Sequence, residues 1–314
     1  TDKFEIVTEV TQPISGVQKK PSPVQVLTKK LGIPLLFPES AKDPEFLNQL
    51  ENLNVDLCVT AAYGNFLPKK FLSIPKFGTV NIHPSLLPQY RGAAPVQRCI
   101  ENGDTDTGVS VAFTVLKMDA GPIITQVPYK LTGNEKASQV LSECFDLGTK
   151  ALLHALPGIF SKSITTTPQD DSMKSEAPKI NKQEGLIDFS TMTALQIHNK
   201  CRAFTDWPGI MCTLQIGPED SPLINMKIVT TVVLESKNET SKLSRDISVI
   251  KLSRAGKTIK LLRIVCGDGS VLGVLEVLPP GSKTMQVLAY LNGIKSTDKR
   301  MRWIAPEALN TAVH

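Results

Sequence analysis

One segment, residues 79–95, constrains the fold and the chemistry of this chain more than any other. It begins as a β-strand, because apolar Val80 and Ile82 alternate with polar Asn81 and His83. Successive side chains of a strand point to opposite faces, so Asn81 and His83 share one face. The proline that follows has no N–H group for strand pairing and is expected to end the strand in a loop. A carboxamide and an imidazole therefore lie together at a strand end, where open α/β sheets bind ligands.

The side chains of this pair suit one kind of chemistry. The Asn81 carboxamide offers N–H donors that can stabilise a developing oxyanion, and the His83 imidazole can pass a proton near neutral pH. The chain has no serine or cysteine in a nucleophile-elbow motif, which favours direct transfer between two bound substrates over a covalent intermediate. Taken alone, however, an Asn-x-His pattern is more often a turn-capping asparagine and a histidine bonded to a backbone carbonyl.

The longer string around the pair narrows these alternatives. Residues 81–88 read Asn-Ile-His-Pro-Ser-Leu-Leu-Pro, and residues 90–95 read Tyr-Arg-Gly-Ala-Ala-Pro. Together they resemble the formyltransferases that use 10-formyltetrahydrofolate. The Arg-Gly-Ala-Ala-Pro run and the large C-terminal extension resemble the methionyl-tRNA formyltransferases in particular. The resemblance implies an α/β fold, in which a Rossmann-like formyltransferase domain with a mostly parallel sheet precedes a smaller, OB-like β-barrel domain.

The same resemblance supplies a reaction and a third catalytic residue. Residues 117–121 read Lys-Met-Asp-Ala-Gly and match the family's Asp-x-Gly, so Asp119 is expected to orient His83 and to help take up the proton. The implied reaction transfers the formyl group of 10-formyltetrahydrofolate to the α-amino group of methionine on initiator tRNA, for translation initiation. The amine would attack the formyl carbon directly, while Asn81 and His83 hydrogen-bond the developing oxyanion.

Two loops are implied to form the folate site. One follows Asn81 and His83 directly. The other, residues 63–68, follows an apolar strand predicted at residues 55–62 to be covered on both faces, and would wall the pterin pocket mostly through backbone groups. A plain strand-to-helix turn fits this second loop equally well. The implied folate-site residues are Ser85, Leu86, Leu87, Pro88, Tyr63, Gly64, Phe66 and Leu67. No metal is implied, because the four histidines form no ligand spacing.

Positive charge is concentrated in the second part of the chain. The formal net charge is +5, of which residues 1–182 carry +1 and residues 183–314 carry +4. This excess is weak evidence for nucleic acid by itself, but a basic barrel can track a phosphate backbone. Trp303 is a candidate for base stacking, although burial is the commoner fate of tryptophan. The residues expected to contact tRNA are Lys19, Lys20, Lys251, Arg254, Lys257 and Lys260.

The length of 314 residues favours two domains. We expect a catalytic domain over residues 1–160, a Ser/Thr/Pro/Lys-rich linker over 161–190 and a tRNA-binding barrel over 191–314. Short strands separated by turns predict the barrel. In the first domain, Ser22 is expected to cap a helix that follows it. No apolar run reaches the roughly 20 residues of a membrane span, and we expect a monomer.

Two features depart from the family's pattern. The family has a strand, a Gly-Thr-Pro loop and a helix before the first strand predicted here, residues 4–10, so we expect a truncated chain or incomplete product with unpaired neighbouring strands. The basic loop of the family is also longer than residues 14–20. This second departure favours the mitochondrial matrix, with the bacterial cytoplasm or a plastid as alternatives. Six scattered cysteines without a C-x-x-C pair indicate buried thiols in a reducing compartment.

Two other functions stay open on the sequence. One is a formyltransferase for a small amine, or a formyltetrahydrofolate hydrolase, on the same fold; the basic barrel argues against both. The other is a non-catalytic RNA-binding protein on a decayed enzyme scaffold. The missing strand and the shortened loop favour that second alternative, whereas the joint presence of Asn81, His83 and Asp119 argues against it.

Overall fold

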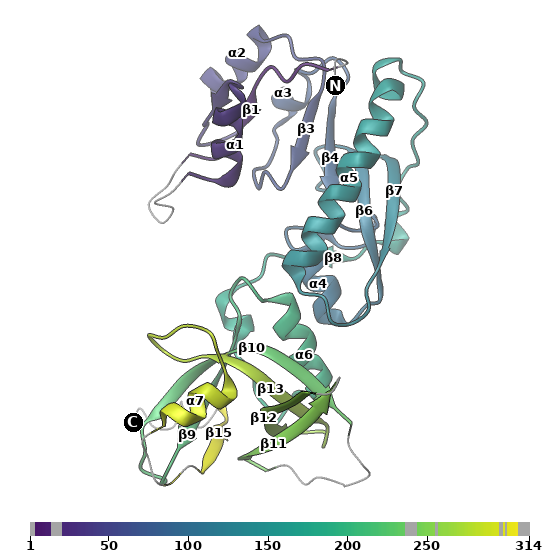
Figure 1. Cartoon of the computed structure of the whole chain (residues 1–314). Helices are drawn as coiled ribbons and strands as arrows, with labels where there is room; N and C mark the ends of the chain where they lie inside the picture. Colours follow the sequence, from purple (N-terminus) through teal and green to yellow (C-terminus); the bar gives the residue numbers. More distant parts are fainter. Residues whose placement is uncertain are drawn as a thin grey trace. The chain divides into compact units, whose positions relative to one another are not determined.

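The structure, a computed structural model, describes residues 4–13, 21–235, 244–254, 257–294, 298 and 300–306. The chain forms two compact units (Figure 1). The first contains Thr1–Pro95, Thr107–Tyr129 and Glu143–Pro178, and the second contains Val96–Asp106, Lys130–Ser142 and Lys179–His314. The domain boundaries predicted from the sequence stay a prediction.

The first unit is built on a four-stranded sheet that carries Asn81 and His83. Its strands, in pairing order, are β3 (Cys58–Ala61), β4 (Thr79–His83), β6 (Asp106–Phe113) and β7 (Ile123–Lys130). Strands β3 and β4 are parallel, whereas β4 and β6 are antiparallel. Two smaller parallel pairs are β1 (Glu9–Val10) with β2 (Leu35–Leu36), and β5 (Arg91–Gly92) with β8 (Glu176–Ala177). The predicted α/β fold with mostly parallel pairing is confirmed.

Strand β3 lies at one edge of this sheet. Within the described ranges, β3 pairs with β4 alone and β1 pairs with β2 alone, so the strands form two separate sheets. The prediction that residues 55–62 are covered on both faces is wrong. The Val59 side chain is 49% exposed and Ala61 is exposed as well, because the described part of the chain places nothing over that face of β3.

Helix α1 (Pro23–Leu31) begins where the sequence predicts. The Ser22 hydroxyl accepts a hydrogen bond from the Gln25 N–H, and the Ser22 N–H donates to the Gln25 side chain. Polar Gln25 and Thr28 are the buried side chains of this helix. Its apolar side chains are exposed instead, namely Val24, Val26, Leu27 and Leu31.

Helix α5 packs against one face of the sheet. The helices that follow α1 are α2 (Pro44–Asn52), α3 (Lys69–Leu72), α4 (Pro95–Asn102) and α5 (Ala137–Phe160). A Cβ at Gly148 of α5 would lie 2.5 Å from Ile82 Cγ2 and 2.7 Å from Val109 Cγ2. Glycine at this position therefore lets α5 pack directly on β4 and β6, which fixes the strand that carries the candidate site.

The second unit is a closed antiparallel barrel, as predicted. Its six strands, in pairing order, are β10 (Leu223–Leu234), β9 (Ile210–Ile216), β15 (Met301–Ile304), β11 (Asp246–Arg254), β12 (Lys257–Val265) and β13 (Val271–Leu278). Pairing of β10 with β13 closes the ring. The smaller elements around it are β14 (Met285–Gln286), α6 (Ala194–Ala203), α7 (Val287–Gly293) and a 3-10 turn, η2 (Lys182–Gly185).

Strand β15 was not predicted from the sequence, yet it joins β9 to β11. It buries Trp303, whose ring lies 5.6 Å from that of Phe189 and whose Nε1–H donates to the Ser244 carbonyl. Trp303 is thus part of the barrel core and not a stacking platform for a base. No described helix combines the length and the apolar character that a bilayer crossing requires.

Candidate active site

Asn81 is held by a neighbour on the adjacent strand. Thr60 of β3 lies in register with Asn81 of β4, and its hydroxyl donates a 2.8 Å hydrogen bond to Asn81 Oδ1. The same hydroxyl lies 3.2 Å from the Val80 carbonyl. With Oδ1 occupied, the Nδ2 group of Asn81 is the end of the carboxamide that is free to donate to a substrate oxygen. Sequence reasoning missed Thr60, because parallel register is not visible in a linear pattern.

His83 ends β4 and is 4% exposed. Its Nε2 lies 2.9 Å from the Tyr90 carbonyl oxygen, an atom that can only accept, so Nε2 carries a proton and donates. Its Nδ1 lies 3.8 Å from Asp119 Oδ1, which is too long for a direct hydrogen bond but close for two charges. Proton exchange at this ring would therefore use Nδ1, the nitrogen that faces the carboxylate.

Asp119 lies in the turn between β6 and β7, with a side chain 17% exposed. Its Oδ2 accepts a 2.9 Å hydrogen bond from the Gly92 N–H, which leaves Oδ1 directed at His83. Its φ of 49° is left-handed, a conformation that non-glycine residues rarely adopt. A Cβ at Gly121 would lie 1.7 Å from the Phe113 carbonyl oxygen, which explains why this turn needs the Asp-x-Gly spacing. The structure thus brings two segments of the chain together, because Asp119 faces His83, which shares strand β4 with Asn81.

A buried arginine supports this arrangement. Arg91 of β5 is 3% exposed, and its guanidinium binds Gln169 Oε1 through Nε at 3.0 Å and Nη2 at 2.7 Å. Its Nη1 donates to Asp171 Oδ1 at 2.9 Å, and Lys117 forms an ion pair with Oδ2 of the same carboxylate. The bonds from Lys117 and then Arg91 lower the pKa of Asp171. Gln169 and Asp171 were not predicted as site residues, because the segment that contains them has a linker composition.

The loop that follows His83 is closed by its own contacts. The Ser85 hydroxyl donates to the Gln89 carbonyl at 2.6 Å, and Leu87 is buried in a cluster with Ala112 and Ile123. The Ser110 hydroxyl donates to the Ser85 carbonyl and accepts the Leu87 N–H. Buried Ser85 and Leu87 therefore shape the loop from inside. Four residues of this loop were predicted for the folate site. Two of them, Leu86 and Pro88, are half-buried.

The second predicted folate loop contains two polar atoms that need partners. Tyr63 Oη and Asn65 Nδ2 are buried, and apart from each other neither has a hydrogen-bond partner in the described ranges. Burial raises the pKa of the Tyr63 phenol, and a hydrogen bond with the Asn65 side chain offsets part of this rise. Buried polar atoms with no partner beyond one another are rare, and a polar heterocycle such as a pterin would offer each of them a further hydrogen bond. In the same loop Gly64 is exposed with φ 76°, Phe66 is 59% exposed and Leu67 belongs to a core cluster.

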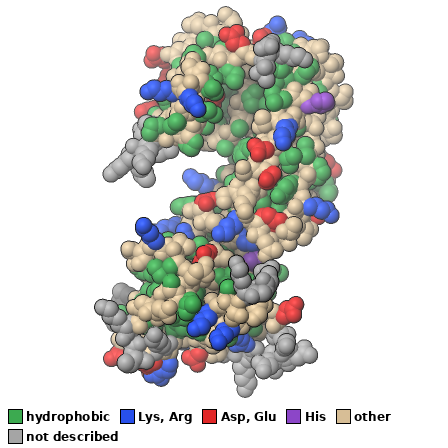
Figure 2. All heavy atoms as spheres, in the orientation of Figure 1, with side chains coloured by type: hydrophobic (Ala, Val, Ile, Leu, Met, Phe, Trp, Pro, Cys, Tyr) green, Lys and Arg blue, Asp and Glu red, His purple; other side chains and the backbone are tan. Residues whose placement is uncertain are grey.

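The predicted tRNA-contact residues of the barrel lie on one hairpin. Lys251 of β11 and Lys260 of β12 are exposed and directly opposite each other, and Arg254 is the register partner of Lys257. Like charges directly opposite each other in a strand pair repel and destabilise it. An anion bound over this hairpin would reduce that repulsion. Elsewhere, Figure 2 shows Lys and Arg side chains in separate groups with Asp and Glu side chains among them on the face drawn. Lys19 and Lys20 lie outside the described residues.

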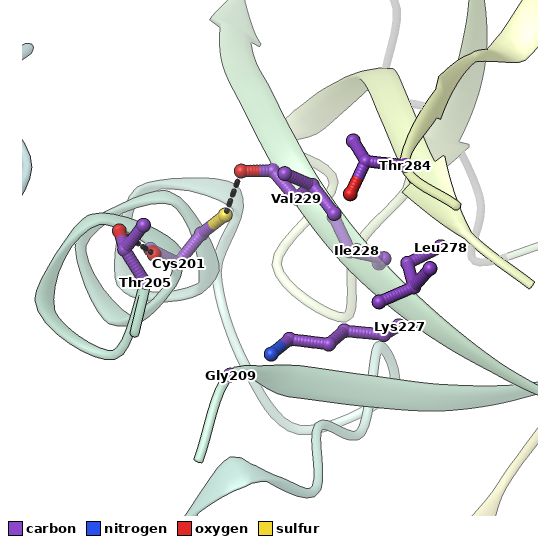
Figure 3. Close-up of a pocket in the computed structure, with 8 residues that line it drawn as sticks. All are labelled: Cys201, Thr205, Gly209, Lys227, Ile228, Val229, Leu278 and Thr284. Carbon is purple, nitrogen blue, oxygen red and sulfur yellow. Dashed lines mark hydrogen bonds between the residues drawn. The ribbon is translucent and has the colours of Figure 1, made fainter. Parts of the chain in front are cut away.

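A cavity of about 90 Å³ lies in the second unit, beside α6 and β10 (Figure 3). In Figure 3 the Cys201 thiol points at the Val229 carbonyl, 3.5 Å away, and the Lys227 chain ends beside Gly209. Burial raises the pKa of the Cys201 thiol, so the thiolate needed for nucleophilic chemistry is disfavoured. The residues that line the cavity are Cys201, Thr205, Gly209, Lys227, Ile228, Val229, Leu278 and Thr284, none of which was predicted as a site residue.

In the described part of the chain, no three His, Cys, Asp or Glu side chains are placed to hold a metal ion, and all six cysteines are free thiols. The candidate site is thus a set of hydrogen-bond donors and one histidine–carboxylate pair, formed by β4 and the turn between β6 and β7.

Comparison with known proteins identifies the family. A model of the formyl transferase family matches residues 5–156, and a model of the formyl transferase C-terminal domain matches residues 179–295. The chain belongs to the formyl transferase family. Among its relatives in this family is a Staphylococcus epidermidis protein named methionyl-tRNA formyltransferase, 32% identical over 94% of this chain and 91% of the relative. A Lactobacillus acidophilus protein of the same name is 36% identical over 92% of this chain and 88% of the relative.

Solved structures of two other proteins share the fold. HypX from Aquifex aeolicus, in complex with tetrahydrofolic acid, aligns with a TM-score of 0.58 and 13% identity over 93% of this chain, which spans half of HypX. An N-formyltransferase from Helicobacter canadensis, in complex with folinic acid and dTDP-3-aminofucose, aligns with a TM-score of 0.53 and 17% identity over 80% of this chain and 81% of that protein. At these identities the likeness shows the fold alone.

Proposed function

We propose that this formyl transferase moves the formyl group of 10-formyltetrahydrofolate to the α-amino group of methionine carried by initiator tRNA, for translation initiation. One observation carries the choice of acceptor. The relatives named methionyl-tRNA formyltransferase match more than nine-tenths of this chain, and the match extends through the barrel as well as the catalytic sheet. A barrel with an exposed pair of opposed lysines suits a polyanionic acceptor better than a small amine.

The donor is a substrate that supplies the formyl group. Asn81, with its Oδ1 held by Thr60, keeps its Nδ2 donors available for the oxygen on which negative charge develops. His83 holds the Tyr90 carbonyl through Nε2 and exchanges a proton through Nδ1. Asp119 faces Nδ1 and stabilises positive charge on the ring. The residues placed to bind the donor are those around Tyr63 and Asn65, whose buried polar atoms have no partner beyond each other among the described residues.

A substrate panel tests this proposal. Wild-type protein and 10-formyltetrahydrofolate are incubated with methionyl initiator tRNA, with methionyl elongator tRNA, with free methionine, with an amino-sugar nucleotide and with water alone as acceptor. We expect formyl transfer to methionyl initiator tRNA at a kcat/KM at least about a hundredfold above that for any small amine. Equal or faster transfer to a small amine, or hydrolysis alone, would contradict the proposed acceptor.

For the compartment, we propose the mitochondrial matrix, with the bacterial cytoplasm and the plastid as the alternatives. The support is the departure of residues 14–20 from the longer basic loop of the family. Cell fractionation with an antibody against this chain tests the assignment. Recovery of the protein outside mitochondria would contradict it.

A further inference from the structure

Gln169 makes an unusually complete set of hydrogen bonds for a residue of linker-like sequence. Its Nε2 donates to the Asp119 carbonyl at 2.8 Å and to the Gly121 carbonyl at 2.7 Å. Its Oε1 accepts from Nε and Nη2 of Arg91. A carboxamide has two N–H donors and two acceptor lone pairs, so all four positions are used. Gln169 therefore joins the turn that carries Asp119 to the buried Arg91.

The orientation of this carboxamide is determined by Arg91. A guanidinium can only donate, so the oxygen of Gln169 must face it, and the NH2 group must face the two carbonyls. Arg91 is held in turn by Asp171 at 2.9 Å, and Asp171 also pairs with Lys117. Asp171 lies in a 3-10 turn, η1 (Asp171–Met173), two residues after Gln169. One short segment thus supplies both the carboxamide and the carboxylate that bind the Arg91 guanidinium.

The same segment reaches the side chain of Asp119 by a second route. Strand β8 pairs with β5, with Ala177 opposite Gly92. A Cβ at Gly92 would lie 2.6 Å from the Ala177 carbonyl oxygen, so this approach is open to glycine alone. The N–H of Gly92 then donates to Asp119 Oδ2 at 2.9 Å. Residues 169–177 accordingly hold the backbone of Asp119 through Gln169 and its carboxylate through Gly92.

Asp119 needs such support, because a left-handed φ of 49° costs a non-glycine residue free energy that the surrounding contacts must offset. We propose that Gln169 is a positioning residue for the transfer reaction, which sets the Asp119 carboxylate against His83 without touching either substrate. The assignment of a catalytic consequence rests on the proposed function. The geometric part, Gln169 holding Asp119, does not depend on it.

Two substitutions at Gln169 separate positioning from packing. Gln169→Glu keeps the shape and the acceptors for Arg91 but turns an oxygen towards two carbonyl oxygens, whereas Gln169→Ala removes both sets of bonds. We expect kcat for methionyl-tRNA to fall about tenfold to a hundredfold in both variants, with KM changed less than about twofold. A purely space-filling role predicts that Gln169→Glu restores the rate, and that result would overturn the proposal.

A double-mutant cycle tests whether Gln169 acts through Asp119. In an Asp119→Ala background, adding Gln169→Ala should cost less than about twofold, because the carboxylate to be positioned is already gone. A full tenfold loss in that background would show that Gln169 acts elsewhere. Gln49→Ala, an exposed glutamine on α2, is the matched control and should keep the wild-type rate.

A readout without turnover keeps the two proposals apart. Exchange of the Gly92 amide hydrogen reports its bond to Asp119 Oδ2. We expect it to quicken about tenfold in Gln169→Ala and equally in Asp119→Ala. If Gln169→Ala does not fold, Asp171→Asn takes its place, with Asp170→Asn as its control. Unchanged Gly92 exchange would overturn the positioning role even in an active enzyme. Faster exchange in a protein that formylates nothing would leave the positioning intact and reject the proposed function.

Discussion

The hydroxyl of Thr60 donates a 2.8 Å hydrogen bond to Oδ1 of Asn81 across the parallel pair β3–β4. This contact decides which end of the Asn81 carboxamide is presented to a substrate. Because the hydroxyl occupies the oxygen, the NH2 group is the free end, which is the polarity that an oxyanion site requires.

Thr60→Val should therefore lower kcat about tenfold, because the isosteric methyl group leaves the Asn81 carboxamide free to rotate. Thr60→Ser, which keeps the hydroxyl, should stay within about twofold of the wild type. Steady-state formyl transfer by both variants checks this prediction. A wild-type rate for Thr60→Val would show that Asn81 is oriented by something else.

Asp119→Asn should reduce kcat by about a hundredfold or more, with little effect on tRNA binding, because an amide cannot stabilise charge on His83 as a carboxylate does. The single oxygen of the new carboxamide can still accept the hydrogen bond from the Gly92 N–H, so the turn is expected to keep its conformation. Filter binding of tRNA and single-turnover transfer give the two quantities. Parallel losses in both would indicate a folding defect instead.

Lys251 and Lys260 are expected to act on tRNA and not on chemistry. Replacing both with alanine should raise KM for methionyl-tRNA at unchanged kcat. The slope of log KM against log salt concentration should fall by about one to two units. Removing two opposed like charges should also leave the barrel as stable as before or slightly more stable. Lys69→Ala, an exposed lysine of the first unit, is the control. An unchanged salt slope would place the tRNA on another surface.

The pattern along the chain was sufficient to predict much of the fold. Alternation at residues 80–83 predicted that Asn81 and His83 share a face, and the turn-separated strands predicted the barrel. Ser22 was correctly predicted as a helix cap, because capping depends on neighbours three residues apart. Strand β15 was missed, since four residues near the chain end carry too little periodicity. Thr60 and Gln169 were missed because their partners lie 21 and 50 residues away.

Glu135 links stability to pH near the start of α5. Its carboxylate accepts bonds from the Thr132 hydroxyl and from the N–H groups of Thr132, Gly133 and Asn134. Burial alone would raise the pKa of Glu135, but these bonds prevail and lower it from 4.5 to about 2. The stabilisation is therefore complete above pH 4.5 and is lost as the pH falls towards 2.

Glu135→Gln should accordingly lower the free energy of unfolding at pH 7 by about 1 kcal/mol, a value reduced for solvent screening of a partly exposed group. The difference from wild type should vanish near pH 2, where the wild-type carboxyl is itself protonated. Urea unfolding of both proteins at several pH values measures it. An equal difference at all pH values would mean that the charge of Glu135 contributes nothing.

The most direct test of the account is the single-turnover rate of formyl transfer from 10-formyltetrahydrofolate to methionyl initiator tRNA, measured for wild type, Asn81→Ala and His83→Ala at saturating tRNA. We predict transfer by the wild type and losses of about a hundredfold or more in each variant, with tRNA affinity unchanged. Wild-type rates in both variants would show that the carboxamide and the imidazole at the end of β4 are not the catalytic groups.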